Sequence, residues 1–146
     1  MRLGKSTFQI TTSVGHSLQT YDLRRGLNLI FLSRPQTPEI ITATCAWQDK
    51  VFAAWGHLRS QSPGGVWVFK RGKRVAVLEG PADLNGPIER LVVFGSWVVG
   101  CWTGGLEVWK TDTYEHYASL RPQSARGEKI YTGVMCNMPT YLNKIF

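Results

Sequence analysis

The stretch LEVWKTD at residues 106–112 reads as a β-strand that ends on an aromatic residue and passes into a polar turn. Two earlier stretches share this form, LQTYDL at 18–23 and VWVFKRG at 66–72. Their aromatic anchors lie 48 and 40 residues apart and are Tyr21, Phe69 and Trp109. A period of roughly 40–45 residues is typical of four-stranded propeller blades. The three stretches therefore predict one repeated structural unit.

Short β-rich runs recur in the same order around each anchor. Four runs separated by turn residues lie within 41–80, and four more lie within 88–121. Residues 7–33 hold three runs that match an incomplete unit without its first strand, and 129–146 read as the start of the next unit. No run has an apolar face at helical spacing, so essentially no helix is expected.

The predicted fold class is all-β, a partial β-propeller of degenerate Trp-Asp (WD) repeats. The runs amount to about three and a third four-stranded blades, and typical propellers close with four to eight. Because a repeat buries its faces only against neighbouring repeats, residues 1–146 are expected to form part of one propeller, with the remainder of the protein outside this sequence.

Composition agrees with a packed β-domain. The chain has 146 residues, 43% of them hydrophobic and 18% charged, with 15 glycines. The start MRLGKSTFQI lacks the apolar core of a signal peptide. The longest apolar stretch, residues 91–102, is too short to span a bilayer. No membrane association is expected.

No constellation for catalysis, metal binding or cofactor binding emerges from the sequence. The three histidines are dispersed, and His16 in SVGHS lacks the spacing of a nucleophile elbow. The odd number of cysteines excludes a simple disulfide framework and favours core packing in a reducing, intracellular compartment; they are Cys45, Cys101 and Cys136. The carboxylates are scattered, and no phosphate-binding glycine loop is present. The protein is not expected to be an enzyme.

The net charge of +7 favours an acidic partner, and nucleic acid is the usual one. The densest cluster is KRGKR at 70–74, at the turn between a third and a fourth strand, and Arg24-Arg25 occupy the equivalent turn one unit earlier. KRGKR has three interpretations: a solvated turn, a contact with RNA phosphates, or a nuclear-import signal. The candidate RNA-phosphate contacts are Arg24, Arg25, Lys70, Arg71, Lys73 and Arg74.

Asp22 follows the anchor Tyr21 and is expected to brace the turn of its own blade, as the Asp of a WD repeat often does. Lys70 and Lys110 stand at the matching positions after Phe69 and Trp109. An ammonium group only donates hydrogen bonds, so those two blades must close their turns in another way.

Three phrases resemble the amino-terminal propeller of one family. They are ITTSVGHSLQTYDLRRGLNLIFLS at 10–33, VFAAWG at 51–56 and PTYLNKI at 139–145, and they resemble the U3 small nucleolar RNA-associated protein 21 family. The resemblance implies a non-catalytic WD-repeat scaffold of the UtpB subcomplex in the nucleolar small-subunit processome. Its implied partners are other UtpB WD-repeat subunits, the U3 small nucleolar ribonucleoprotein and pre-ribosomal RNA. It implies no cofactor, and Tyr21, Asp22 and Trp109 map to structural repeat positions.

Two other functions remain open from the residues alone. One is a generic WD propeller adaptor that binds proteins or peptides in another intracellular complex. The other is a self-contained basic RNA-binding β-domain, which would require these 146 residues to fold alone.

Overall fold

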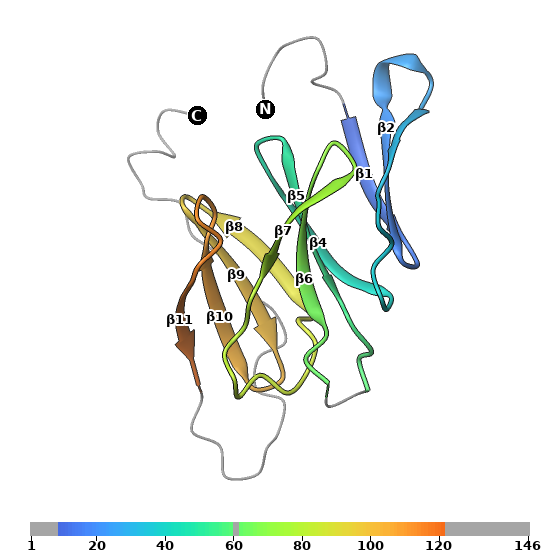
Figure 1. Ribbon diagram of the computed structural model, residues 1–146. Coiled ribbons are helices and arrows are strands. Elements are labelled where there is room, and N and C mark those ends of the chain that lie inside the picture. The colour runs from blue at the N-terminus through green and yellow to red at the C-terminus, as the bar shows by residue number, and fades with distance from the viewer. Residues whose placement is uncertain (1–8, 60–61, 122–146) are drawn as a thin grey trace.

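The computed structural model describes residues 9–59 and 62–121, and within these ranges the protein is built from short antiparallel strands (Figure 1). The strands are β1 (Gln9–Val14), β2 (Ser17–Asp22), β3 (Asn28–Leu32), β4 (Ile41–Trp47), β5 (Lys50–Trp55), β6 (Gly65–Lys70), β7 (Lys73–Leu78), β8 (Arg90–Phe94), β9 (Trp97–Trp102), β10 (Gly105–Lys110) and β11 (His116–Leu120). A 3-10 turn, Leu23–Arg25, is the only helical element of the described residues.

The strands form three sheets in chain order. The first sheet is β1-β2-β3, the second is β4-β5-β6-β7 and the third is β8-β9-β10-β11. The main backbone contact between the second and third sheets joins their first strands, β4 and β8. Each four-stranded sheet is thus a blade whose first strand lies innermost, which confirms the predicted all-β partial propeller.

The same irregularity recurs in all three sheets. The pairing register between the third and fourth blade strands shifts by one residue immediately before the anchor, between Thr20 and Tyr21 in the first sheet. The other shifts lie between Val68/Phe69 and Val108/Trp109. A β-bulge at one fixed place in each sheet shows that the anchors occupy one position of a single repeat.

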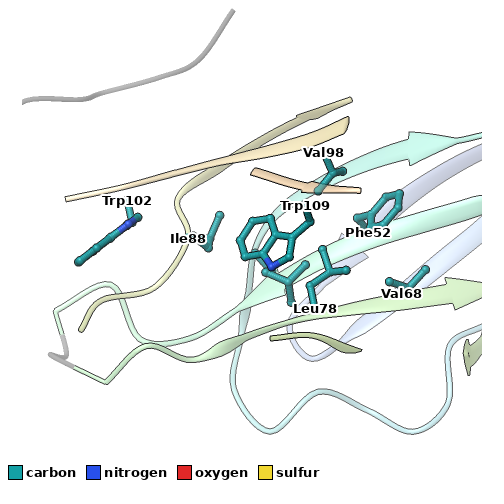
Figure 2. Packing of buried hydrophobic residues seen from close by; sticks show 9 residues of the cluster. Phe52, Val68, Leu78, Ile88, Val98, Trp102 and Trp109 are labelled. Atoms are coloured by element: carbon teal, nitrogen blue, oxygen red, sulfur yellow. The ribbon is translucent and has the colours of Figure 1, made fainter. Parts of the chain in front are cut away.

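The largest core lies between the second and third sheets (Figure 2). Trp109 of β10 is 1% exposed and packs with residues from both sheets and from the connector between them, among them Phe52, Val68, Leu78, Ile88 and Val98. Gly100 on β9 leaves room for the indole ring, because a Cβ there would lie 3.1 Å from Trp109 and 3.0 Å from Ile88. The indole Nε1 also donates to the backbone oxygen of Glu79 at 2.8 Å.

A smaller core joins the first and second sheets. It consists of Leu18, Ile41, Ala53 and Phe69. The anchor Phe69 therefore packs toward the preceding sheet, just as Trp109 does one repeat later. The second and third blades thus each present their anchor to the blade before them.

The expected unit at 129–146 and the cysteine Cys136 lie outside the described residues. Among the residues that are described, no helix is both long and apolar enough to cross a membrane.

Trp109→Ala should remove the central side chain of the larger core. We expect the free energy of unfolding to fall by about 3–5 kcal/mol, because the change leaves a large cavity. Val75→Ala is the control, since Val75 is 48% exposed on the outer strand β7, and it should change stability by no more than about 0.5 kcal/mol. Urea unfolding of the full-length protein, followed by circular dichroism, measures both. Equal effects would contradict the central role of Trp109.

Candidate nucleic-acid interface

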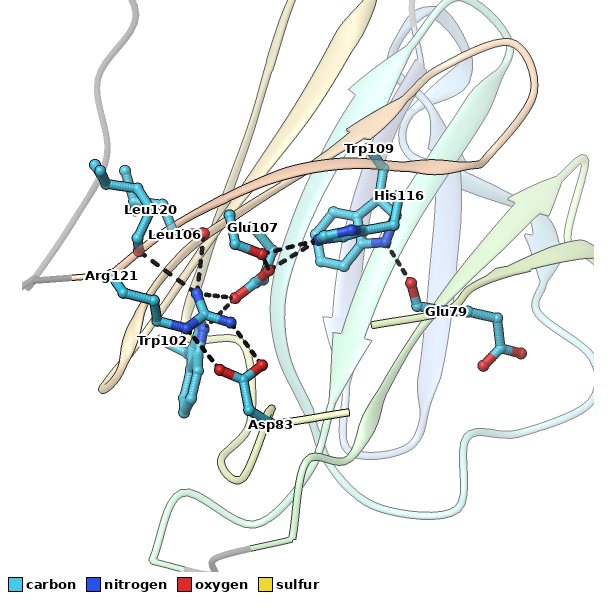
Figure 3. Close-up of polar contacts among 10 residues, drawn as sticks. Glu79, Asp83, Trp102, Leu106, Glu107, Trp109, His116, Leu120 and Arg121 are labelled. Carbon is cyan, nitrogen blue, oxygen red and sulfur yellow. Dashed lines mark hydrogen bonds and ion pairs between the residues drawn. The ribbon is translucent and has the colours of Figure 1, made fainter. Parts of the chain in front are cut away.

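A carboxylate is buried on the same face of β10 as Trp109. Glu107 is 0% exposed and accepts hydrogen bonds from Trp102 Nε1 at 2.8 Å and from Ser119 Oγ at 2.5 Å (Figure 3). His116 Nε2 lies 2.9 Å from Glu107 Oε1, and Arg121 Nη1 lies 2.5 Å from Oε2. Both carboxylate oxygens are therefore satisfied, as a buried charge requires.

This polar network extends to the connector between the two blades. Arg121 follows β11 and donates from Nε and Nη2 to the two oxygens of Asp83, each at 3.0 Å. The hydrogen bond from Arg121 lowers the pKa of Asp83. The bidentate pair ties the end of the outer strand to the segment that leads from β7 into β8.

The electrostatics of Glu107 are a balance of opposing effects. Burial alone raises the pKa of Glu107. The hydrogen bonds from Ser119, His116, Trp102 and Arg121 lower it, and their sum leaves the pKa below its ordinary value of 4.5. Glu107 therefore remains ionised at neutral pH.

The trio of Ser119, His116 and Glu107 has the residue types of a hydrolase triad but not its geometry. Ser119 Oγ and Glu107 Oε1 both approach Nε2 of His116, at 3.3 and 2.9 Å. A triad needs the acid on one ring nitrogen and the nucleophile on the other. Ser119 also donates directly to the carboxylate. The trio is thus arranged to hold Glu107 rather than to activate a serine.

Sequence reasoning did not single out Glu107, although a signal was present. Residues 105, 107 and 109 alternate onto one face of β10, so Glu107 shares the buried face of Trp109. In the second blade the matching position is Trp67, which meets Trp55 edge-on with ring centroids 5.7 Å apart. The buried Nε1 of Trp55 has no hydrogen-bond partner among the described residues, because Trp67 and not a carboxylate occupies the position equivalent to Glu107.

The KRGKR turn joins β6 and β7 with positive φ angles at Arg71 (51°) and Gly72 (82°). Two of its cations already have neighbours: Lys70 Nζ lies 3.4 Å from Asp49, and the Arg74 guanidinium stacks 4.4 Å above the Trp67 ring. Lys73 is exposed. The two-residue turn thus closes without an aspartate brace, and it displays its cations at the rim of the blade.

The turn between β2 and β3 holds the earlier pair of candidates. Asp22 Oδ1 accepts a hydrogen bond from the backbone nitrogen of Arg24 at 2.9 Å, within its own turn. Arg24 is exposed, and Arg25 ends the 3-10 turn. Figure 1 shows this turn and the β6–β7 turn at the same end of their sheets.

The remaining sequence candidates for chemistry are structural. His16 Nδ1 lies 2.8 Å from the backbone oxygen of Thr37 and so joins the β1–β2 turn to the connector before β4. Burial raises the pKa of the Cys45 thiol to about 12, and Cys101 is buried. Within residues 9–59 and 62–121, no group of three or more metal-ligating side chains gathers.

Comparison with known proteins identifies the repeat. Residues 10–146 match the family described as the WDR36/Utp21 first beta-propeller. The U3 small nucleolar RNA-associated protein 21 of Saccharomyces cerevisiae is 32% identical over 96% of this chain. Its homolog from Schizosaccharomyces pombe is 29% identical over 94% of the chain. The chain spans 14% of the length of each relative.

Solved structures agree on the fold. The computationally designed Ika4 protein superposes with a TM-score of 0.66 at 17% identity, over 92% of this chain and 77% of its own. The designed Ika8 protein gives a TM-score of 0.64 at 12% identity, over 94% of this chain and 39% of its own.

Glu107→Gln should keep the shape of the side chain and remove its charge. Folding lowers the pKa of Glu107, so its negative charge stabilises the folded protein at any pH above the ordinary glutamate pKa. This stabilisation is lost as the pH falls through the pKa that Glu107 has in the folded protein. We expect the variant to be roughly 1–3 kcal/mol less stable at neutral pH. The difference should shrink below pH 4.5.

Urea unfolding across a pH series measures this difference. Glu115→Gln is the control, since Glu115 is exposed and its side chain lies outside the polar network. A stability difference for Glu107→Gln that persists undiminished into acid would show that its charge is not what stabilises the blade.

Proposed function

Because the chain belongs to the WDR36/Utp21 family, within that family's first β-propeller, we propose that the protein is a non-catalytic scaffold of the nucleolar small-subunit processome. In this role it supports processing of pre-ribosomal RNA and assembly of the small ribosomal subunit. The match over residues 10–146, together with two relatives named for their association with U3 small nucleolar RNA, carries the proposal.

The described part of the chain suits a scaffold better than an enzyme. Its polar groups hold the strands of the third blade together: Glu107 is enclosed by four partners, and His116 contacts both Ser119 and Glu107 through one ring nitrogen. Partial burial raises the pKa of the Cys45 thiol to about 12, which makes it a poor nucleophile at neutral pH.

The proposed organisation follows the repeat. Residues 7–33 form an incomplete blade, 41–80 and 88–121 each form a complete one, and 129–146 begin the next blade of the same propeller. The bulges at equivalent places and the two four-stranded sheets support this division. The partners proposed for the whole protein are other WD-repeat subunits of UtpB and the U3 ribonucleoprotein.

We further propose that the basic turns contact RNA phosphates. The β2–β3 and β6–β7 turns lie at one end of adjacent sheets, and their candidate cations are Arg24, Arg25, Lys70, Arg71, Lys73 and Arg74. Turn cations recognise the charge of the backbone and position an RNA without reading its sequence.

Affinity purification of the tagged full-length protein from nuclear extract tests the processome assignment. We expect U3 RNA, pre-ribosomal RNA and the WD-repeat subunits of UtpB to copurify, and a nucleolar signal for the tagged protein in cells. A tag-only preparation is the control. Recovery of an unrelated set of proteins without U3 RNA would favour a WD adaptor of another complex.

Replacing the four cations of residues 70–74 with serine tests the RNA contact. Each phosphate contact on a single strand contributes about −0.7 to the slope of log affinity against log salt, so the slope should flatten by up to roughly 3. The loss should be similar for unrelated RNA sequences. Thermal unfolding should show stability within about 0.5 kcal/mol of wild type. An unchanged slope would leave KRGKR as a solvated turn.

A further inference from the structure

Four cations stand side by side across one end of the second sheet. Lys50 of β5 pairs directly with Lys70 of β6, and Lys70 pairs with Lys73 of β7. Arg34, from the connector after β3, forms a parallel bridge with Lys73. Its backbone nitrogen donates to Gly72 O at 2.7 Å, and its backbone oxygen accepts from Arg74 N at 3.1 Å. Directly paired residues share a face, so these four make a cationic row.

The cationic row is electrostatically unfavourable for the isolated protein, because like charges directly opposite on a sheet are destabilising. Nearby groups contact two of the four cations. Asp49 lies 3.4 Å from Lys70, and Lys50 lies over the rings of Trp47 and Tyr114 at 5.2 and 5.4 Å. Lys73 and Arg34 are exposed at the outer end of the row.

The fold does not require a cation at each of these cross-strand positions, because the other two sheets carry different sets of residues there. The matching cross-strand set of the first sheet is Gln9, Asp22 and Asn28. In the third sheet Trp97 and Lys110 stand at the positions of Lys50 and Lys70. Within the described residues the row is therefore specific to the second blade, and a polyanionic ligand would relieve its repulsion.

We propose that the cationic row of Arg34, Lys50, Lys70 and Lys73 is a track for successive phosphates of one RNA strand. Strands in a sheet lie about 4.8 Å apart, so the row extends over roughly 14 Å in a line. A phosphodiester backbone is a linear array of negative charges that matches this arrangement. The inference rests on the proposed RNA contact but narrows it: within residues 70–74 only Lys70 and Lys73 take part, so replacing all four cations with serine flattens the slope by about 1.4 rather than 3.

The cationic row divides the KRGKR cluster. Lys70 and Lys73 belong to it, whereas Arg74 pairs with Phe69 and so points to the opposite face, where it stacks on Trp67. Arg71 lies at the tip of the turn rather than in the row. Arg34 and Lys50 belong to the row although both lie outside residues 70–74.

The test compares two variants of the full-length protein that each lose two positive charges. Arg34→Gln/Lys50→Gln removes cations of the row from two distant segments, and Arg71→Gln/Arg74→Gln removes cations of the cluster that lie outside the row. Binding of a fluorescein-labelled oligouridylate is measured by anisotropy over a KCl series. We expect the row variant to flatten the salt slope by about 1.4 and the off-row variant to leave it nearly unchanged.

A thermal melt verifies that each variant is folded. Lys50 Nζ lies over two aromatic rings, so its replacement could affect folding. If the first variant unfolds, Arg34→Gln/Lys73→Gln replaces it, because this variant changes exposed side chains only. Relief of like-charge repulsion should leave its melting temperature equal to or above that of wild type.

The possible outcomes distinguish failure of the cationic-row hypothesis from failure of the broader proposal that the basic turns contact RNA. Equal flattening by the row and off-row variants would overturn the row while leaving RNA contact by the basic turns intact. Failure of the wild-type protein to bind oligouridylate would overturn both. If polyglutamate then bound in a way that depends on Arg34 and Lys50, the row would be a site for an acidic protein segment instead.

Discussion

The structure depends on the packing of each sheet against the sheet before it. A blade that is apolar on both faces cannot be stable alone, and the anchor at the end of its third strand is the side chain that fills the space toward its neighbour. Trp109 does this for the third sheet and Phe69 for the second. The bidentate pair of Arg121 with Asp83 adds a polar tie between the third blade and the connector that leads to it.

The two interfaces fill equivalent positions by different chemistry. In the third blade, Trp102 donates a hydrogen bond to Glu107, and the same carboxylate also contacts His116, Ser119 and Arg121. In the second blade, Trp55 meets Trp67, whose ring carries the Arg74 guanidinium. One solution relies on a buried charge with all its hydrogen bonds made, and the other on stacked aromatic surface. The same repeat position thus accepts either a carboxylate or an aromatic residue.

The sequence was sufficient to predict the repeat, because aromatic anchors and turn residues are local signals. It was insufficient for the cationic row and for the polar network, because both depend on which residues face each other across strands. Lys50 and Lys70 are opposite only because of the pairing register of β5 and β6, and the long connection between these strands, residues 56–64, does not fix that register from sequence. The triplet RPQ recurs at 34–36 and 121–123, which could have aligned Arg34 with Arg121. Arg34 contacts Gly72 and Arg74 through its backbone, whereas Arg121 contacts Asp83 through its side chain. That alignment could not have predicted this difference.

The bulge beside each anchor has a consequence for how the molecule avoids self-association. Outer strands of a propeller expose unpaired backbone groups that could template the addition of a foreign strand and lead to aggregates. A bulge interrupts the ladder and increases the local twist, so the rim of each blade is a poor match for a flat incoming strand. Exposed Lys73 and Arg74 at the start of β7 add charge to the same edge. Strand addition at the rim is thereby discouraged.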